Sequence, residues 1–265
     1  MSPSQQKQLL ALFSCATALG LTACGGGSSG TSTATATPSP SPAPAAATTI
    51  AGSAVKGPVA NATVTFKSGT TGATLATGTT DSNGAYSISV PVSSGDVIVE
   101  VTGGTYTDEA TGASTTLSTP LRNVVTANGG TVQGFVTPLT TLAYTYAFGT
   151  ATTGVTASAY AAKATSVASQ FQVADLNALP VVSGSMNTYG QVLRGLSQYL
   201  ANNSVTLTNF TTTAMSSAQW TSFTSLYNAA YQKANPGSSV TFNFTGTGLS
   251  VSGTGAGGGT GTCGV

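Results

Sequence analysis

The sequence of 265 residues contains no histidine. Histidine supplies the general base of Ser-His-Asp and Cys-His sites, and it is the commonest protein ligand of transition metals such as zinc. Its absence excludes these classes of active site. Serine-lysine, carboxylate-pair and tyrosine chemistry remain open.

Charge is also scarce, because Asp, Glu, Lys and Arg together make up only 5% of the chain, against about a quarter in ordinary soluble proteins. The seven basic residues are scattered singly rather than clustered. Nucleic-acid binding requires Lys/Arg clusters that displace counterions from phosphates. We therefore expect no nucleic-acid partner.

The N-terminal apolar run, residues 9–23, is too short for a transmembrane helix, which needs roughly 20 apolar residues. It follows Lys7 and ends in small residues, which is typical of a cleaved secretory signal. Residues 21–24, Leu-Thr-Ala-Cys, resemble the lipobox of bacterial lipoproteins. The resemblance implies that residues 1–23 are removed and that Cys24 carries acyl chains such as palmitate.

Gly25 follows the lipid-bearing cysteine where an aspartate would retain a lipoprotein at the inner membrane in the enterobacterial sorting rule. The resemblance thus implies an outer-membrane location in the cell envelope, with its periplasmic or surface face left open. Several acyl chains on one residue anchor a protein firmly. The expected partners are the membrane, through the lipid, and a protein or glycan ligand in the envelope.

Residues 24–49 form a Gly/Ser-rich and then Pro-rich linker that cannot bury a core. At the other end, Cys263 lies in a Gly-rich segment and has no intramolecular partner once Cys24 is lipidated. Two interpretations stay open for Cys263: its partner lies in a lost C-terminal region, or the thiol is free or pairs between molecules.

Short Val/Ile/Thr runs with alternating apolar residues predict β-strands between residues 50 and 136. In the run 96–101, for example, Val97, Val99 and Val101 share one face. Asp81-Ser82-Asn83-Gly84 has the composition of a hairpin turn. Six or seven such strands require a second sheet to cover their apolar face, so we expect a sandwich.

A pattern of small and apolar residues in this segment resembles the carboxypeptidase regulatory-like domain, a transthyretin-like antiparallel β-sandwich. The pattern consists of Gly52, Val55, Gly57-Pro58-Val59, Ala62, Val64 and Thr80-Asp81-Ser82-Asn83-Gly84-Ala85-Tyr86. The resemblance implies a non-catalytic accessory or ligand-presenting domain and transfers no catalytic residues. The longer loop at residues 103–112 departs from the short ending of the simplest members.

From residue 137 onward, apolar residues recur at helical spacing. Thr137 before Pro138, then Thr156, Asn187 and Ser216, indicate four helix starts. Four such helices with short loops predict a small helical bundle. We interpret their aromatic stripes as core rather than as a sugar-stacking platform. The expected buried faces are Tyr160, Ala164, Val167, Ala168 and Phe171 in the second helix, and Trp220, Phe223, Tyr227, Ala230 and Tyr231 in the fourth.

The expected fold is therefore α+β and multi-domain. Its parts are a signal peptide at 1–23, a lipid-anchored linker at 24–49, a transthyretin-like sandwich at 50–136, a helical domain at 137–236, and a strand with a Gly-rich segment at 237–265. The strand is expected at residues 240–244.

Polar residues of the sandwich loops are the candidate ligand-binding residues, because loops on a rigid sheet carry recognition. The candidate ligand or cation loop comprises Asp81, Asn83, Tyr106, Asp108 and Glu109. Adjacent residues of extended chain point to opposite faces, which argues against a catalytic Asp108–Glu109 pair. Calcium binding at these oxygen ligands stays an alternative, and no other cofactor or metal is expected.

Lysine chemistry offers two weaker candidates. Ser53-Ala54-Val55-Lys56 fits the Ser-x-x-Lys pattern of penicillin-binding enzymes, but it lies in a β segment, and Lys56 is expected at the solvent-facing end of a strand. Transthyretin-like surface domains can also contain a lysine-asparagine isopeptide bond. The nearest counterpart here is Lys56 or Lys67 with Asn123 and Glu100.

These observations predict an outer-membrane lipoprotein that acts as a non-catalytic binding or structural module, with no enzymatic activity. The alternative is a hydrolase of cell-wall or surface polysaccharide that uses carboxylates. It would need Asp175, the only acid beyond the sandwich, to reach Asp108 or Glu109.

Overall fold

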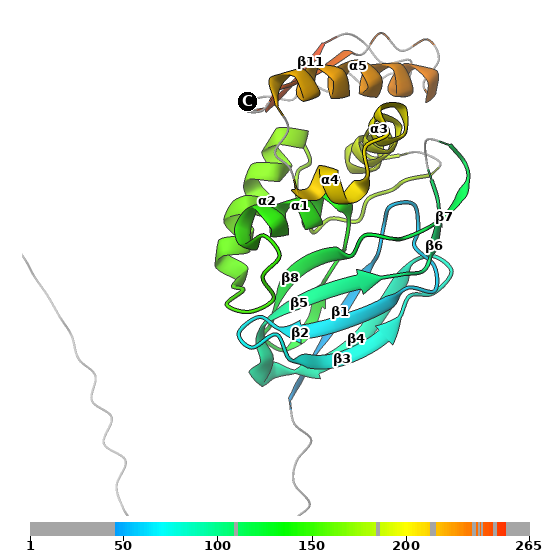
Figure 1. The fold of residues 1–265 in the computed structure, drawn as a ribbon. Helices are drawn as coiled ribbons and strands as arrows, with labels where there is room; N and C mark the ends of the chain where they lie inside the picture. The colour runs from blue at the N-terminus through cyan, green and yellow to red at the C-terminus, as the bar shows by residue number, and fades with distance from the viewer. Residues whose placement is uncertain are drawn as a thin grey trace, which may run out of the picture. The chain divides into compact units, whose positions relative to one another are not determined.

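The computed structural model describes residues 46–108, 111–183, 186–212, 216–234, 237, 239, 241–245 and 248–252. These residues contain both sheets and helices, as the α+β expectation requires. The strands β1–β9 come first and the helices α1–α5 follow, and a short two-stranded sheet succeeds them (Figure 1). Sheets and helices belong to one compact unit. The signal peptide, Cys24, most of the linker and Cys263 lie outside the described residues.

The first sheet is built around β1 (Ala47–Ser53). On one side β1 pairs antiparallel with β4 (Ala85–Pro91), and on the other it pairs parallel with β9 (Gly130–Gln133). The expectation of purely antiparallel sheets is therefore wrong for this pair. A parallel neighbour requires a long crossover, and the chain between β1 and β9 supplies the rest of the β structure.

The second sheet has the order β3 (Thr74–Thr79), β2 (Thr63–Ser68), β5 (Gly95–Thr102) and β8 (Leu121–Ala127), and all its pairs are antiparallel. Val97, Val99 and Val101 are fully buried and share one hydrophobic core with Ile50 of β1. Because successive side chains of a strand alternate between faces, the predicted single face of these valines is confirmed. The two sheets pack across this core.

The predicted turn at residues 81–84 is present, but it does not close a hairpin. It joins β3 to β4, and these strands lie in different sheets. Asp81 holds the turn, because its Oδ1 accepts hydrogen bonds from the backbone N–H groups of Asn83 and Ala85. Gly84 adopts a φ of 76°, which only glycine takes readily. Turn composition indicated the reversal, but not the sheet in which each strand is placed.

The segment 103–112, expected as a loop, includes the strand β6 (Thr105–Thr107), which pairs with β7 (Ser114–Thr116) in a small hairpin. Its first strand contacts the turn after β1, because the backbone groups of Ala60 and Thr105 exchange hydrogen bonds. Gly57 in that turn has a φ of 67°, and a Cβ atom there would lie 2.4 Å from the carbonyl oxygen of Thr107. This close approach brings Lys56 beside the hairpin.

Helices α1 (Pro138–Phe148), α2 (Ala157–Phe171), α3 (Thr188–Asn203) and α5 (Ser217–Ala234) begin where the sequence predicts. The side chains of Thr137, Thr156 and Asn187 each accept a hydrogen bond from a backbone N–H of the first turn, which is how such residues cap helices. The sequence reasoning missed α4 (Leu207–Thr212). Its six residues are too few to show a helical period.

The aromatic residues of the helices form a core, as predicted. Trp220, Phe223 and Tyr227 of α5 are buried, as are the second helix's Tyr160 and Phe171. The side chains of Ala230 and Tyr231 lie outside the described ones. A hairpin of β10 (Thr241–Thr245) and β11 (Gly248–Ser252) covers this cluster, so β11 is the partner of the strand expected at 240–244.

The helices share a hydrophobic core with the second sheet. Ile98 of β5 and Val124 of β8 project from the face opposite the valine face and pack with α1 and α2 residues. Helix α1 lies against β8, as Figure 1 shows. The second sheet is thus covered on both faces, by a sheet and by helices. Over the part of the chain that the structure describes, no helix is long and apolar enough to cross a membrane.

Candidate functional site

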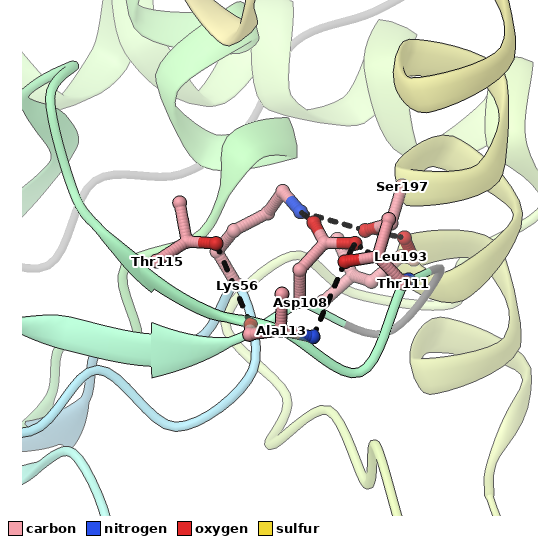
Figure 2. Close-up of polar contacts among 7 residues, drawn as sticks. All are labelled: Lys56, Asp108, Thr111, Ala113, Thr115, Leu193 and Ser197. Carbon is pink, nitrogen blue, oxygen red and sulfur yellow. Dashed lines mark hydrogen bonds and ion pairs between the residues drawn. The ribbon is translucent and has the colours of Figure 1, made fainter.

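Lys56 is a buried cation, and its expected position at a solvent-facing strand end is wrong. It follows β1 in a tight turn and is only 2% exposed. Its Nζ donates hydrogen bonds to Asp108 Oδ2 at 2.9 Å and to Ser197 Oγ at 2.7 Å (Figure 2). A charge is stable in such a place only when it is paired and hydrogen-bonded. The cluster therefore joins the β-sandwich to helix α3.

Further contacts of this cluster come from the β6–β7 hairpin. The ring centroid of Tyr106 lies 5.0 Å from Lys56 Nζ, within the range of a cation–π interaction. Asp108 Oδ1 accepts hydrogen bonds from the backbone N–H and the hydroxyl of Thr111. Two of the predicted site residues, Tyr106 and Asp108, are thus brought together around a lysine. Sequence spacing gave no indication of this role for Lys56.

The lysine meets a serine, but the geometry does not suit Ser-Lys catalysis. The contacting serine is Ser197, 141 positions later in the chain, and it is 1% exposed. Its hydroxyl donates to the carbonyl oxygen of Leu193 at 3.0 Å. A nucleophilic serine needs a neutral lysine as base and a path for the substrate carbonyl. Here the ammonium faces a carboxylate, and packed residues cover the serine.

The remaining predicted site residues do not join this cluster. Asp81 and Asn83 are exposed, and the Asp81 carboxylate serves its own turn. Glu109 lies outside the described residues. Within the described ranges, no three His, Cys, Asp or Glu side chains gather in a way that could hold a metal ion. Calcium binding therefore stays an alternative without a described ligand set.

A second ionic cluster lies on the helix-facing side of the second sheet. Glu100 accepts hydrogen bonds from Lys67 at 2.5 Å and from Arg122 at 2.8 Å, and Arg122 lies 5.3 Å from the centroid of the Tyr144 ring in α1. Asn123 follows Arg122 in the strand and therefore faces the other side. Its amide donates to the Phe135 carbonyl oxygen, so the isopeptide arrangement of Lys67 and Asn123 does not form.

The pKa of Glu100 makes this cluster sensitive to acid. Burial alone raises the pKa, but hydrogen bonds and charges from Lys67 and Arg122 outweigh it and hold the pKa below its ordinary value of 4.5. A lowered carboxyl pKa stabilises the folded state fully above the ordinary pKa, and this stability is lost as the pH falls toward the lowered value.

We therefore expect the free energy of unfolding to fall as the pH drops below 4.5, and Glu100→Gln to weaken this dependence. The difference in stability between wild type and variant should shrink in acid, because the native carboxylate is then protonated. Urea unfolding at a series of pH values measures it. Parallel acid profiles for the two proteins would contradict the assigned role of Glu100.

A cavity of about 530 Å³ opens where α2 and the segment after it face β8 and β9. Val124 and Val132 line it from the sheets, and Asp175 and Asn177 line it from the segment after α2. Asp175 is its only acid among the described lining residues, and Asp108 is not among them. Sequence reasoning noted Asp175 only as a scarce acid. The signal in the sequence that could have indicated this cavity is the row of small residues at helical spacing in α2.

No protein-family model matches this sequence, and no curated protein matches it. The resemblances to bacterial lipoproteins and to carboxypeptidase regulatory-like domains stay predictions from the residues quoted above. Any assignment of function therefore depends on the sequence motifs and on the geometry of the described residues.

Proposed function

We propose that this chain is a lipoprotein of the bacterial outer membrane that acts as a non-catalytic binding or structural module of the cell envelope. Residues 21–24 would supply the anchor through Cys24, and the linker would separate the folded unit from the lipid. The expected end of the linker at residue 49 is wrong, because β1 already begins at Ala47. The proposed envelope partners are a protein or a glycan.

The proposal that the module is non-catalytic depends on one observation, the burial of the Lys56 cluster. The side chains of Lys56 and Asp108 are 2% and 16% exposed, and the third member, Ser197, is 1% exposed. These groups could form a nucleophile, a base and an acid if a substrate reached them. Instead, the three side chains hydrogen-bond to one another between the sandwich and α3. Their polar groups therefore stabilise the folded unit.

The arrangement of the β-strands supports the transthyretin-like assignment as part of this proposal. Two sheets enclose one core, and the turn at residues 81–84 passes from one sheet to the other. The parallel pairing of β1 with β9 is a departure from the antiparallel sandwich that the resemblance implies. We therefore propose a variant of that fold in which β9 extends the sheet of β1.

The hydrolase alternative receives less support. Glycoside cleavage by carboxylates needs two acids, one on each side of the scissile bond. The cavity beside α2 offers one acid, Asp175, among its described lining residues, while Asp108 is paired with Lys56. We therefore do not adopt this activity.

The anchor is tested by the intact mass and membrane fractionation of the full chain produced in a Gram-negative bacterium. We expect the mass of a protein cleaved before Cys24 that carries acyl chains, and we expect it in the outer-membrane fraction. Cys24→Ala should abolish both the mass of the acyl chains and the outer-membrane location.

Cys15→Ala is the matched control, because Cys15 lies inside the apolar run of the signal, before the cleavage site. This variant should keep the lipid and the membrane location. An unlipidated wild-type protein, or a Cys24→Ala protein that is still recovered in the outer-membrane fraction, would overturn the anchoring proposal.

A further inference from the structure

The cavity beside α2 has the size and the walls of a small-molecule site. Its volume of about 530 Å³ lies within the range of roughly 300–1,000 Å³ that ligand pockets occupy. Small alanine side chains of α2 line one side of the cavity, and valine side chains of the sheets line the other. The alanines are Ala157, Ala161, Ala164 and Ala168, and the valines are Val124 and Val132.

Tyr160 of α2 is one of the lining residues, and its buried hydroxyl is an unsatisfied polar group. It lines the cavity and is 3% exposed, and its hydroxyl has no hydrogen-bond partner among the described residues. Buried hydroxyls are normally hydrogen-bonded, because leaving one unpaired costs its lost hydration. Burial, with smaller contributions from Tyr189 and Asp175, raises its pKa well above the ordinary value of 10. The hydroxyl is therefore neutral and can donate or accept a hydrogen bond.

The charge of the cavity selects among ligands. Asp175 lies exposed in its lining, and no lysine or arginine is among the described lining residues. One Asp175 oxygen, Oδ1, accepts from the backbone N–H of Asn177, which orients the carboxylate. Such a site attracts a cation and repels an anion.

We propose that this cavity binds a small organic amine, with its apolar body against the alanines of α2 and its ammonium group toward Asp175, where it can also donate to the Tyr160 hydroxyl. This site is separate from the Lys56 cluster and does not depend on the lipid anchor. Its failure would leave the envelope proposal untouched, and failure of the anchor would leave the site untouched.

The test titrates the full chain carrying Cys24→Ala, so that no detergent is needed, with 2-phenylethylamine in a calorimeter. The uncharged 2-phenylethanol and the anionic phenylacetate serve as matched probes of similar shape. We expect saturable binding of the amine, at least about fivefold tighter than of the alcohol, as an exposed ion pair allows, and no binding of the anion.

Two variants locate the binding. Asp175→Asn keeps the acceptor for Asn177 and should remove the preference for the amine over the alcohol, whereas Asp81→Asn, an acid outside the cavity lining, should leave it unchanged. Tyr160→Phe should weaken amine binding but raise the melting temperature of the free protein by about 2–4 °C, because it removes an unpaired buried hydroxyl.

Three results would overturn the proposal. They are the absence of saturable amine binding, equal affinity for amine and alcohol, and an amine preference that survives Asp175→Asn in a folded protein. A melting temperature that falls in Tyr160→Phe would show that the hydroxyl is already satisfied in the free protein, by water for example, and would remove the tyrosine from the site.

Discussion

Replacement of Lys56 with methionine is expected to lower the free energy of unfolding by about 3 kcal/mol, because it leaves one side of a buried ion pair without its partner. Methionine keeps the length and the apolar stem of the side chain. The loss of stability therefore comes from the Asp108 carboxylate and the Ser197 hydroxyl, because both accept hydrogen bonds from Lys56 Nζ in the wild-type protein. Urea unfolding at neutral pH measures it.

The matched control is Lys163→Met, because Lys163 lies exposed on α2. Its effect should stay within about 0.5 kcal/mol, as is usual for surface positions. The double variant Lys56→Met with Asp108→Leu should be more stable than Lys56→Met alone, because no charge is then left unpaired. A Lys56→Met protein as stable as wild type would show that the cluster does not join the sandwich to α3.

Phe223→Ala is expected to cost about 3–5 kcal/mol of stability, as truncation of a buried aromatic side chain usually does. Phe223 is fully buried at the centre of the helical core. Its ring centroid lies 4.8 Å from that of Phe244 in β10 and 5.7 Å from that of Phe171 in α2. Loss of the ring leaves a cavity between α5, α2 and β10, and its cost adds to the lost burial of the ring. Thermal and urea unfolding both report it.

Two further variants make this prediction specific. Phe223→Leu retains most of the apolar volume and should cost clearly less than the alanine variant. Leu179→Ala removes an apolar side chain that is 50% exposed and should change stability by no more than about 0.5 kcal/mol. Equal costs for Phe223→Ala and Leu179→Ala would contradict the placement of Phe223 in a packed core.

The elements themselves were largely predictable because their signals are local. The caps at Thr137, Thr156 and Asn187 satisfy the first N–H groups of a helix from within the same turn. The face of Val97, Val99 and Val101 follows from the two-residue period of a strand. The short helix α4 was missed because six residues carry too little of a period.

The candidate site was less predictable, because its members come from distant parts of the chain. Tyr106 and Asp108 were selected from the sequence, but the lysine that holds them was expected in solvent. Their partner Ser197 lies on a helix that follows the whole sandwich. Nothing within a window of neighbouring residues specifies that such groups meet.

The sequence by itself determined the scarcity of charge, the absence of histidine, the cap positions and the alternating faces, because composition and local periodicity need no knowledge of distant residues. Only the tertiary structure decided that the turn at residues 81–84 passes between two sheets, that Lys56 is buried against α3, and that Tyr160 and Asp175 line one cavity. These features depend on which apolar faces pack together. That choice is made by burial of surface over the whole chain.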